Sequence, residues 1–178
     1  MASTSQISAT VVRHALPPRP NLIFQQTLRP LFLYGTLRAM PLLAWALTGD
    51  SRNIHAVQSL VKPAVLRGYM RFSLHGKDYP ALIKHDATSS VDGLLFSPQN
   101  KAQRLKLDDF EGEVYVATKI QVEVGEDGET VDADVYLWNG ELDAVSSDQW
   151  ELEIFIRERL EDWIEIFAGI ELVGDSGP

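Results

Sequence analysis

Short apolar runs separated by glycine and polar turns fill most of the chain between residues 30 and 140, and this pattern predicts strands rather than long helices. The expected strands are residues 31–33, 61–72, 79–83, 91–96, 114–124 and 131–138. Polar, glycine-containing turns at 75–78 and 125–128 predict two hairpins. Gly68 interrupts the run 61–72, which predicts a bulge or a close approach of backbone there.

Three segments have helical rather than alternating spacing. Residues 40–47 are apolar on most sides and predict a short buried helix that ends near Gly49. Ser97-Pro98 is expected to cap a second helix, ending at Gly112. Asp148 and Glu151 resemble a capping box for a last helix that runs to Gly169. Together the elements predict an α+β fold, a small closed or nearly closed β-barrel with a few flanking helices and a C-terminal helix.

Length and composition favour one domain preceded by a tail. The chain has 178 residues, of which 45% are hydrophobic, enough for a single core. We expect a flexible tail at 1–29 and a folded domain at 30–178. The tail is rich in Ser, Thr and Arg and contains no Asp or Glu, so a weak organelle transit peptide stays open as an alternative.

Charge and cysteine content exclude several classes of function. A net charge of −9 makes nucleic acid an unfavourable partner, and no apolar run approaches the roughly 20 residues that a membrane span needs. The absence of cysteine favours a cytoplasmic protein, and the four isolated His residues predict neither a metal site nor a cofactor. We therefore expect a small-molecule partner, and the sequence does not determine the oligomeric state.

The first candidate site is the stretch Leu31–Arg38, which reads LFLYGTLR. An apolar strand stops abruptly at Gly35, a residue that can take a positive φ and bring backbone close to a ligand. The amides of Gly35, Thr36 and Leu37 would then converge on one oxygen, as backbone amides do around an oxyanion. The plain alternative is an ordinary turn after a strand.

The second candidate is Glu111, in the last turn of its predicted helix and directly before Gly112. The helix terminus disfavours a negative charge, and Phe110 beside it adds desolvation, so the pKa of Glu111 is expected to be raised. A carboxyl group close to neutrality suits general acid–base catalysis. An exposed, inert glutamate at a helix end is the alternative.

Five motifs in this order resemble the gamma-glutamylcyclotransferase family, in particular its avirulence-induced-protein-like and gamma-glutamylamine branch. They are LFLYGTLR, Gly68-Tyr69, Tyr79-Pro80-Ala81-Leu82, Val91-Asp92-Gly93 and LDDFEGEVY. The resemblance covers about residues 31–138, and the start of the last helix is similar to plant and fungal members. It implies a small barrel, Glu111 as the acid–base residue and a γ-glutamyl amine or peptide-like substrate. The implied substrate-binding residues are Leu33, Tyr34, Gly35, Thr36, Leu37, Arg38, Tyr79 and Tyr115.

One position departs from the family pattern. Two residues after Tyr115 the family often carries Arg, and this chain has Ala117, with Lys119 nearby. The predicted activity is an intramolecular cyclisation that releases 5-oxoproline and an amine. Two alternatives stay open: an acid–base enzyme for another small molecule of secondary metabolism, and a non-catalytic stress- or defence-related binding protein that uses the acidic last helix. A pocket closed over Glu111 would favour the binding protein.

Overall fold

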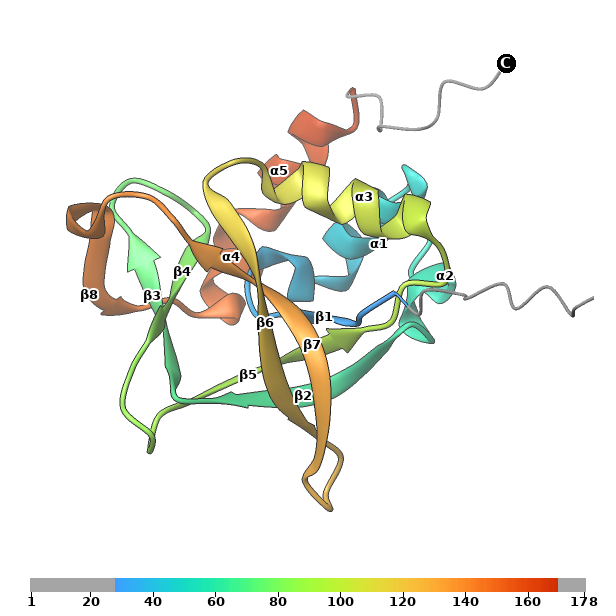
Figure 1. The fold of residues 1–178 in the computed structure, drawn as a ribbon. Helices are drawn as coiled ribbons and strands as arrows, with labels where there is room; N and C mark the ends of the chain where they lie inside the picture. The colour runs from blue at the N-terminus through green and yellow to red at the C-terminus, as the bar shows by residue number, and fades with distance from the viewer. Residues whose placement is uncertain (1–27, 170–178) are drawn as a thin grey trace, which may run out of the picture.

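A closed five-stranded barrel forms the centre of the molecule in this computed structural model, which describes residues 28–169 (Figure 1). Around the barrel the strand order is β1-β5-β2-β6-β7. The strands are β1 (Leu31–Leu33), β5 (Ser90–Phe96), β2 (Val61–Arg67), β6 (Tyr115–Val124) and β7 (Glu129–Trp138). The short β1 closes it, antiparallel to β5 and parallel to β7. The predicted barrel is confirmed, whereas nearly all of the predicted tail 1–29 lies outside the described residues.

A second sheet of three strands stands beside the barrel in the order β4-β3-β8. It contains β3 (Tyr69–Leu74), β4 (Pro80–Lys84) and β8 (Val145–Gln149). The single strand predicted at 61–72 is wrong, because the chain turns at Gly68 with φ of 77° and passes from the barrel into this sheet. The positive φ explains why glycine stands at that corner. Strand β8 was not predicted, since its sequence VSSDQ lacks a strand pattern.

The three predicted helices are present with changes at their ends, and the short helix α2 (His55–Gln58) was not predicted. The other helices are α1 (Met40–Thr48), α3 (Lys101–Glu111), α4 (Leu152–Glu158) and α5 (Leu160–Phe167), with short 3₁₀ turns η1 (Thr36–Arg38) and η2 (Leu142–Ala144). Helix α1 ends at Gly49, as predicted.

Two predicted helix caps are wrong. Helix α3 begins after Asn100, whose side-chain oxygen accepts a hydrogen bond from the Gln103 amide at 2.9 Å, and not at Ser97. Ser97 instead donates its amide to the Leu60 carbonyl, which keeps that segment extended. Asp148 belongs to β8 and caps nothing, and the single last helix predicted there is two helices divided at Arg159.

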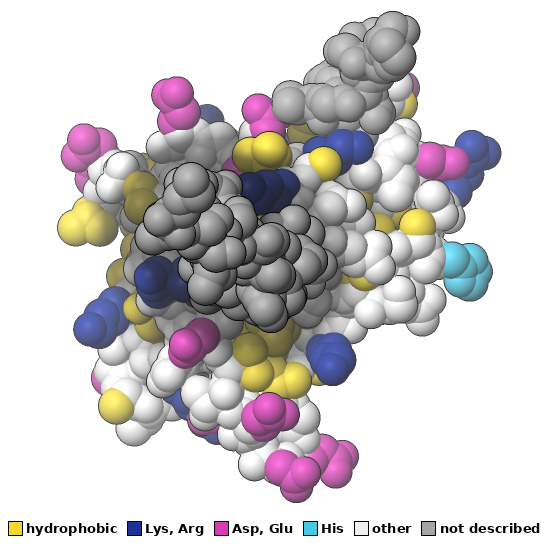
Figure 2. All heavy atoms as spheres, turned by 45° about the vertical axis from the view of Figure 1, so that its right-hand side comes forward, with side chains coloured by type: hydrophobic (Ala, Val, Ile, Leu, Met, Phe, Trp, Pro, Cys, Tyr) yellow, Lys and Arg dark blue, Asp and Glu magenta, His cyan; other side chains and the backbone are white. Residues whose placement is uncertain are grey.

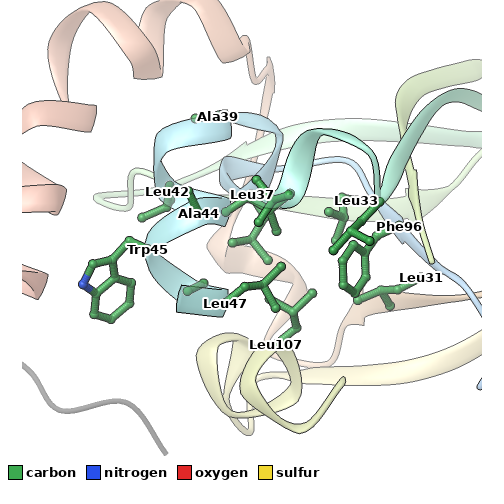
Figure 3. Close-up of a cluster of buried hydrophobic side chains, with 14 of the residues drawn as sticks. Leu31, Leu33, Leu37, Ala39, Leu42, Ala44, Trp45, Leu47, Phe96 and Leu107 are labelled. Atoms are coloured by element: carbon green, nitrogen blue, oxygen red, sulfur yellow. The ribbon is translucent and has the colours of Figure 1, made fainter. Parts of the chain in front are cut away.

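Strand β1 is buried on both faces. Leu31 and Leu33 contact the cluster beneath the helices, whereas Phe32 points into the cluster inside the barrel. Figure 3 shows Leu33 and Phe96 beside Leu37 of η1, which lies against α1. Continuous burial explains why this strand is apolar at every position. It also fixes where the chain emerges at Tyr34.

Charged side chains of both signs are interspersed over the described part of the face that carries α2 (Figure 2). A mixed surface of this kind does not form the continuous basic patch that nucleic acid requires. Within residues 28–169, no helix combines the length and hydropathy needed to cross a bilayer.

The crossing of β5 over β1 generates a stability prediction. A Cβ at Gly93 would lie 2.5 Å from the Leu33 carbonyl oxygen and 2.5 Å from the Phe32 ring. Gly93→Ala should therefore lower the free energy of unfolding by about 1–3 kcal/mol, the usual cost of overpacking a core. Urea denaturation measures the change. Gly169→Ala is the control because a Cβ there meets no atom within 4 Å, and equal stability of the two variants would contradict the packing at this crossing.

Candidate functional site

A small, partly open cavity lies where the barrel, the second sheet and α3 meet. Its lining residues are Phe32, Leu33, Tyr34, Gly35, Thr36, Leu37, Tyr79, Pro80, Glu111, Tyr115 and Tyr136. The cavity measures about 20 Å³. That is room for about one water molecule. The two candidate motifs of the sequence therefore meet in one place, although about 75 residues separate them in the chain.

The turn after β1 presents unused hydrogen-bond donors. The amides of Arg38 and Ala39 donate to the carbonyls of Gly35 and Thr36, both at 3.0 Å. Among the described residues, the amides of Gly35, Thr36 and Leu37 find no acceptor. Donors left without partners in a small cavity are available to an anionic or carbonyl oxygen.

The reason for glycine in this turn differs from the prediction. Gly35 has φ of −109°, so no left-handed conformation demands it. A Cβ there would instead lie 3.1 Å from Cγ of Pro80. Gly35 therefore allows β4 to approach the turn closely, and this approach forms one wall of the cavity.

Long-range hydrogen bonds hold the turn in place. The Tyr34 hydroxyl donates to the Tyr136 carbonyl at 2.7 Å, and the Tyr34 carbonyl accepts from Nη1 of Arg71 at 2.8 Å. Arg71 also donates to the Trp150 carbonyl and to Asp92, and its guanidinium lies over the Trp150 ring at 5.6 Å. Because these bonds reach β7, β5 and the segment before α4, the turn is tied to three separate parts of the fold.

Glu111 is the unusual group of the site. It is the last residue of α3, immediately before Gly112, as predicted. The residue is half-buried, its carboxyl group forms no hydrogen bond or ion pair with any residue in 28–169, and desolvation by the surrounding side chains raises its pKa to about 8. The pKa is raised as predicted, and desolvation is its cause. At neutral pH most of this carboxyl group is therefore protonated.

The tyrosines around Glu111 keep their protons. Burial raises the pKa values of Tyr34, Tyr115 and Tyr136, and the nearby carboxyl group of Glu111 raises each of them further. The Tyr115 hydroxyl donates to the Pro80 carbonyl at 2.7 Å, and that of Tyr136 donates to Asp108 at 2.5 Å. They act as fixed donors that hold the walls of the cavity together.

Most of the predicted site residues line this cavity. Leu33, Tyr34, Gly35, Thr36, Leu37, Tyr79, Tyr115 and Glu111 do so. Arg38 does not, because its guanidinium turns away to pair with Asp92 in an open groove on the barrel. Ala117 is exposed on β6 and does not reach the cavity, so the departure from the family pattern leaves the lining unchanged.

Sequence reasoning missed Phe32, Pro80 and Tyr136 as lining residues. Phe32 and Pro80 stand within quoted motifs, so their neighbours could have indicated them. Tyr136 lies in an alternating strand far along the chain, and only the parallel pairing of β7 with β1 brings it to the turn.

Comparisons with known proteins agree with this architecture. The family model described as gamma-glutamyl cyclotransferase, AIG2-like, matches residues 31–152. "Protein AIG2 C" of Arabidopsis thaliana is 26% identical over 137 residues, covering 77% of this chain and 78% of that protein. "AIG2-like protein C" of the same plant is 28% identical over 134 residues, covering 75% and 73%. A solution structure of an Arabidopsis thaliana protein superposes with a TM-score of 0.56 at 25% identity, covering 78% and 79%.

The buried carboxyl group should make stability depend on pH. The pKa of about 8 in the folded protein exceeds the value near 4.3 of an unfolded chain, so between these values the folded state binds more protons. Stability should therefore fall as pH rises through this window. Glu111→Gln removes the ionisation and should raise the melting temperature by several degrees at pH 9, with little change at pH 5.

Thermal unfolding of both proteins from pH 5 to pH 9 measures the effect. Asp109→Asn is the matched control. It removes the same charge from the same helix, at a residue that is exposed. A constant difference in melting temperature between Glu111→Gln and the parent protein across this range would contradict the burial of Glu111.

Proposed function

The chain belongs to the AIG2-like gamma-glutamyl cyclotransferase family, and we propose that it cyclises a γ-glutamyl compound to release 5-oxoproline and an amine. One observation carries the proposal. A half-buried carboxyl group without a partner, its pKa raised by desolvation, lines the same small cavity as three amides without partners. An acid–base group facing fixed donors is the arrangement that acyl transfer needs.

The proton balance of the reaction requires only Glu111. A bound α-ammonium group beside the carboxyl favours its ionised form, in spite of the burial that opposes ionisation. Glu111 then takes a proton from the α-ammonium group, and the freed amine attacks the γ-carbonyl carbon. The new carbon–nitrogen bond closes the five-membered ring. When the bond to the leaving amine breaks, Glu111 returns the proton to that amine. Glu111, ionised again, then takes the second proton from the ring nitrogen, which the attack left positively charged, and passes it to the amine, which departs as an ammonium ion.

The turn would stabilise the charge that develops during this attack. The γ-carbonyl oxygen becomes negative in the tetrahedral intermediate, and the amides of Gly35, Thr36 and Leu37 are suitably free to donate to it. Since nucleophile and carbonyl belong to one molecule, holding the chain bent supplies much of the acceleration. Well-oriented intramolecular reactions reach effective molarities of about 10⁵ M or more. No covalent bond to the protein is needed.

The small size of the cavity favours a second candidate, the non-catalytic binding protein. A cavity of about 20 Å³ does not admit a γ-glutamyl group, so catalysis requires the walls to separate. The contacts that would have to yield are aromatic: Tyr79 lies 6.2 Å from Tyr115 and 6.4 Å from Trp163, between ring centroids. Edge-to-face pairs of this kind are worth about 0.5–1.5 kcal/mol each, which binding energy can offset.

A repurposed acid–base enzyme is the third candidate. Its support is the sequence departure at Ala117, and the exposed position of that residue weakens this support. The three candidates separate experimentally, because only the first yields 5-oxoproline.

The direct test measures 5-oxoproline release from a panel of γ-glutamyl amines and peptides. We expect turnover on at least one member, and Glu111→Gln should lower kcat by about 10²–10⁴-fold with KM little changed, since glutamine cannot accept the proton. Asp109→Asn should retain full activity because its side chain is exposed outside the cavity. Unaltered turnover in Glu111→Gln would refute the role of Glu111. Failure of the parent protein on every compound would favour the other two candidates.

The pH dependence of kcat/KM provides an independent prediction. The free protein must hold Glu111 ionised to accept the proton, and burial places its pKa at about 8. The value of kcat/KM should therefore rise about tenfold per pH unit below pH 8 and level off above it, as long as the substrate amine stays protonated. A profile that is already level at pH 6 would show that the group being titrated is not Glu111.

A further inference from the structure

A second hollow, larger than the cavity of Glu111, opens on the side of the barrel. Its lining residues are Arg29, Leu66, Arg67, Tyr69, Lys84, Lys119, Ile120, Gln121 and Asp132. It measures about 580 Å³ and shares no residue with the cavity. This volume lies within the range of small-molecule sites. We call it the basic hollow, because four of its residues are cationic in a protein of net charge −9.

The course of the strands explains why the hollow exists. Strands β2 and β6 are paired at only two positions, Ala64 with Val124 and Val65 with Glu123. Beyond them β2 bends at Gly68 into β3, whereas β6 continues along β7 (Figure 1). A gap therefore opens between β2 and β6 on this side of the barrel. The floor of the hollow is apolar, formed by Leu66 and by the partly buried side chains of Tyr69 and Ile120.

The cations of the hollow fall into two kinds. Arg29 pairs with Asp134 at 2.9 Å, and Arg67 pairs with Glu123 at 2.9 Å. The side-chain ammonium groups of Lys84 and Lys119 form no ion pair or hydrogen bond with any other described residue. These two ammonium groups are therefore available to a ligand.

The carboxylates near Lys119 already have ion-pair or hydrogen-bond partners. Asp134, its cross-strand neighbour, is held by Arg29 and by Arg104 at 2.8 Å. Asp132, the acid that lines the hollow, accepts a hydrogen bond from Gln121 at 3.0 Å. Asp132 keeps its negative charge, but four cations against one carboxylate leave the lining of the hollow cationic, although the chain as a whole carries an excess of acid.

We propose that the basic hollow binds a small molecule with two or more carboxylate or phosphate groups. Lys84 and Lys119 come from different strands, β4 and β6, and would each meet one anionic group as a mobile point charge. Arg67 adds guanidinium N–H donors at the rim, and the apolar floor accommodates the carbon skeleton of the ligand. The proposal does not depend on the function of the Glu111 cavity.

The same two strands connect the hollow with that cavity. Lys84 follows Pro80 by four residues, and Lys119 follows Tyr115 by four, so about 13 Å of strand separates each pair. The hydrogen bond from Tyr115 to Pro80 ties β4 to β6 at the cavity end. A ligand held between the lysines would tie them together at the other end.

Isothermal titration calorimetry of the full chain at constant ionic strength tests the proposal. The probes are citrate for carboxylates and pyrophosphate for phosphates. We expect saturable 1:1 binding of at least one probe, weakened about tenfold or more in Lys84→Gln and in Lys119→Gln and lost in the double variant. Binding of only one probe identifies which anionic group the site prefers.

Lys101→Gln is the matched control, because it removes the same charge from an exposed position at the start of α3. It should bind the probe as the parent protein does. Amide shifts in an NMR titration should appear at Tyr69 and Gln121. Equal affinity in the parent and double variant, no saturable binding of either probe, or shifts confined to the Glu111 cavity would overturn the proposal.

Discussion

The burial of β1 on both faces determines how the site is assembled. A strand of three residues closes the barrel between β5 and β7 while its outer side chains anchor α1 and α3. Neither the barrel nor the helices against it can shift without exposing apolar surface, which costs about 25 cal/mol of free energy for each Å² exposed. The chain therefore leaves the strand at Tyr34 in a fixed direction. The turn that follows reaches the end of α3, where Glu111 lies.

The position of Glu111 in this arrangement is electrostatically unfavourable for its ionised form. A half-buried carboxyl group without a cation or donor disfavours its charged form, and its pKa rises to about 8. The hydroxyl groups of the surrounding tyrosines donate hydrogen bonds to backbone carbonyls and to Asp108, and none of them donates to Glu111.

The sequence predicted the elements whose signals are local. The apolar run before Tyr34 and the hairpin at 125–128 follow from periodicity and turn chemistry alone, and Glu111 is followed by the predicted C-terminal glycine of its helix. The partnership of the two motifs came from the resemblance of their order to a known family. The cavity then confirmed that they are neighbours.

The errors have a common physical origin in long-range contacts. Whether Gly68 is a bulge or a corner depends on which sheet accepts the following strand, and β8 pairs only because β3 presents a free edge. Arg38 stands in the recognised motif, yet Asp92 from a distant strand draws it away from the cavity. The basic hollow is likewise invisible in the sequence, since its cations come from four separate segments.

The account depends most on Glu111 being a desolvated carboxyl group that lacks a partner and has a raised pKa. A ¹³C NMR titration of its side-chain carboxyl carbon, assigned by comparison with Glu111→Gln, measures this property without a substrate. The account predicts a midpoint near pH 8, since burial raises the pKa to about 8. A midpoint close to the ordinary value of about 4.3 would contradict it.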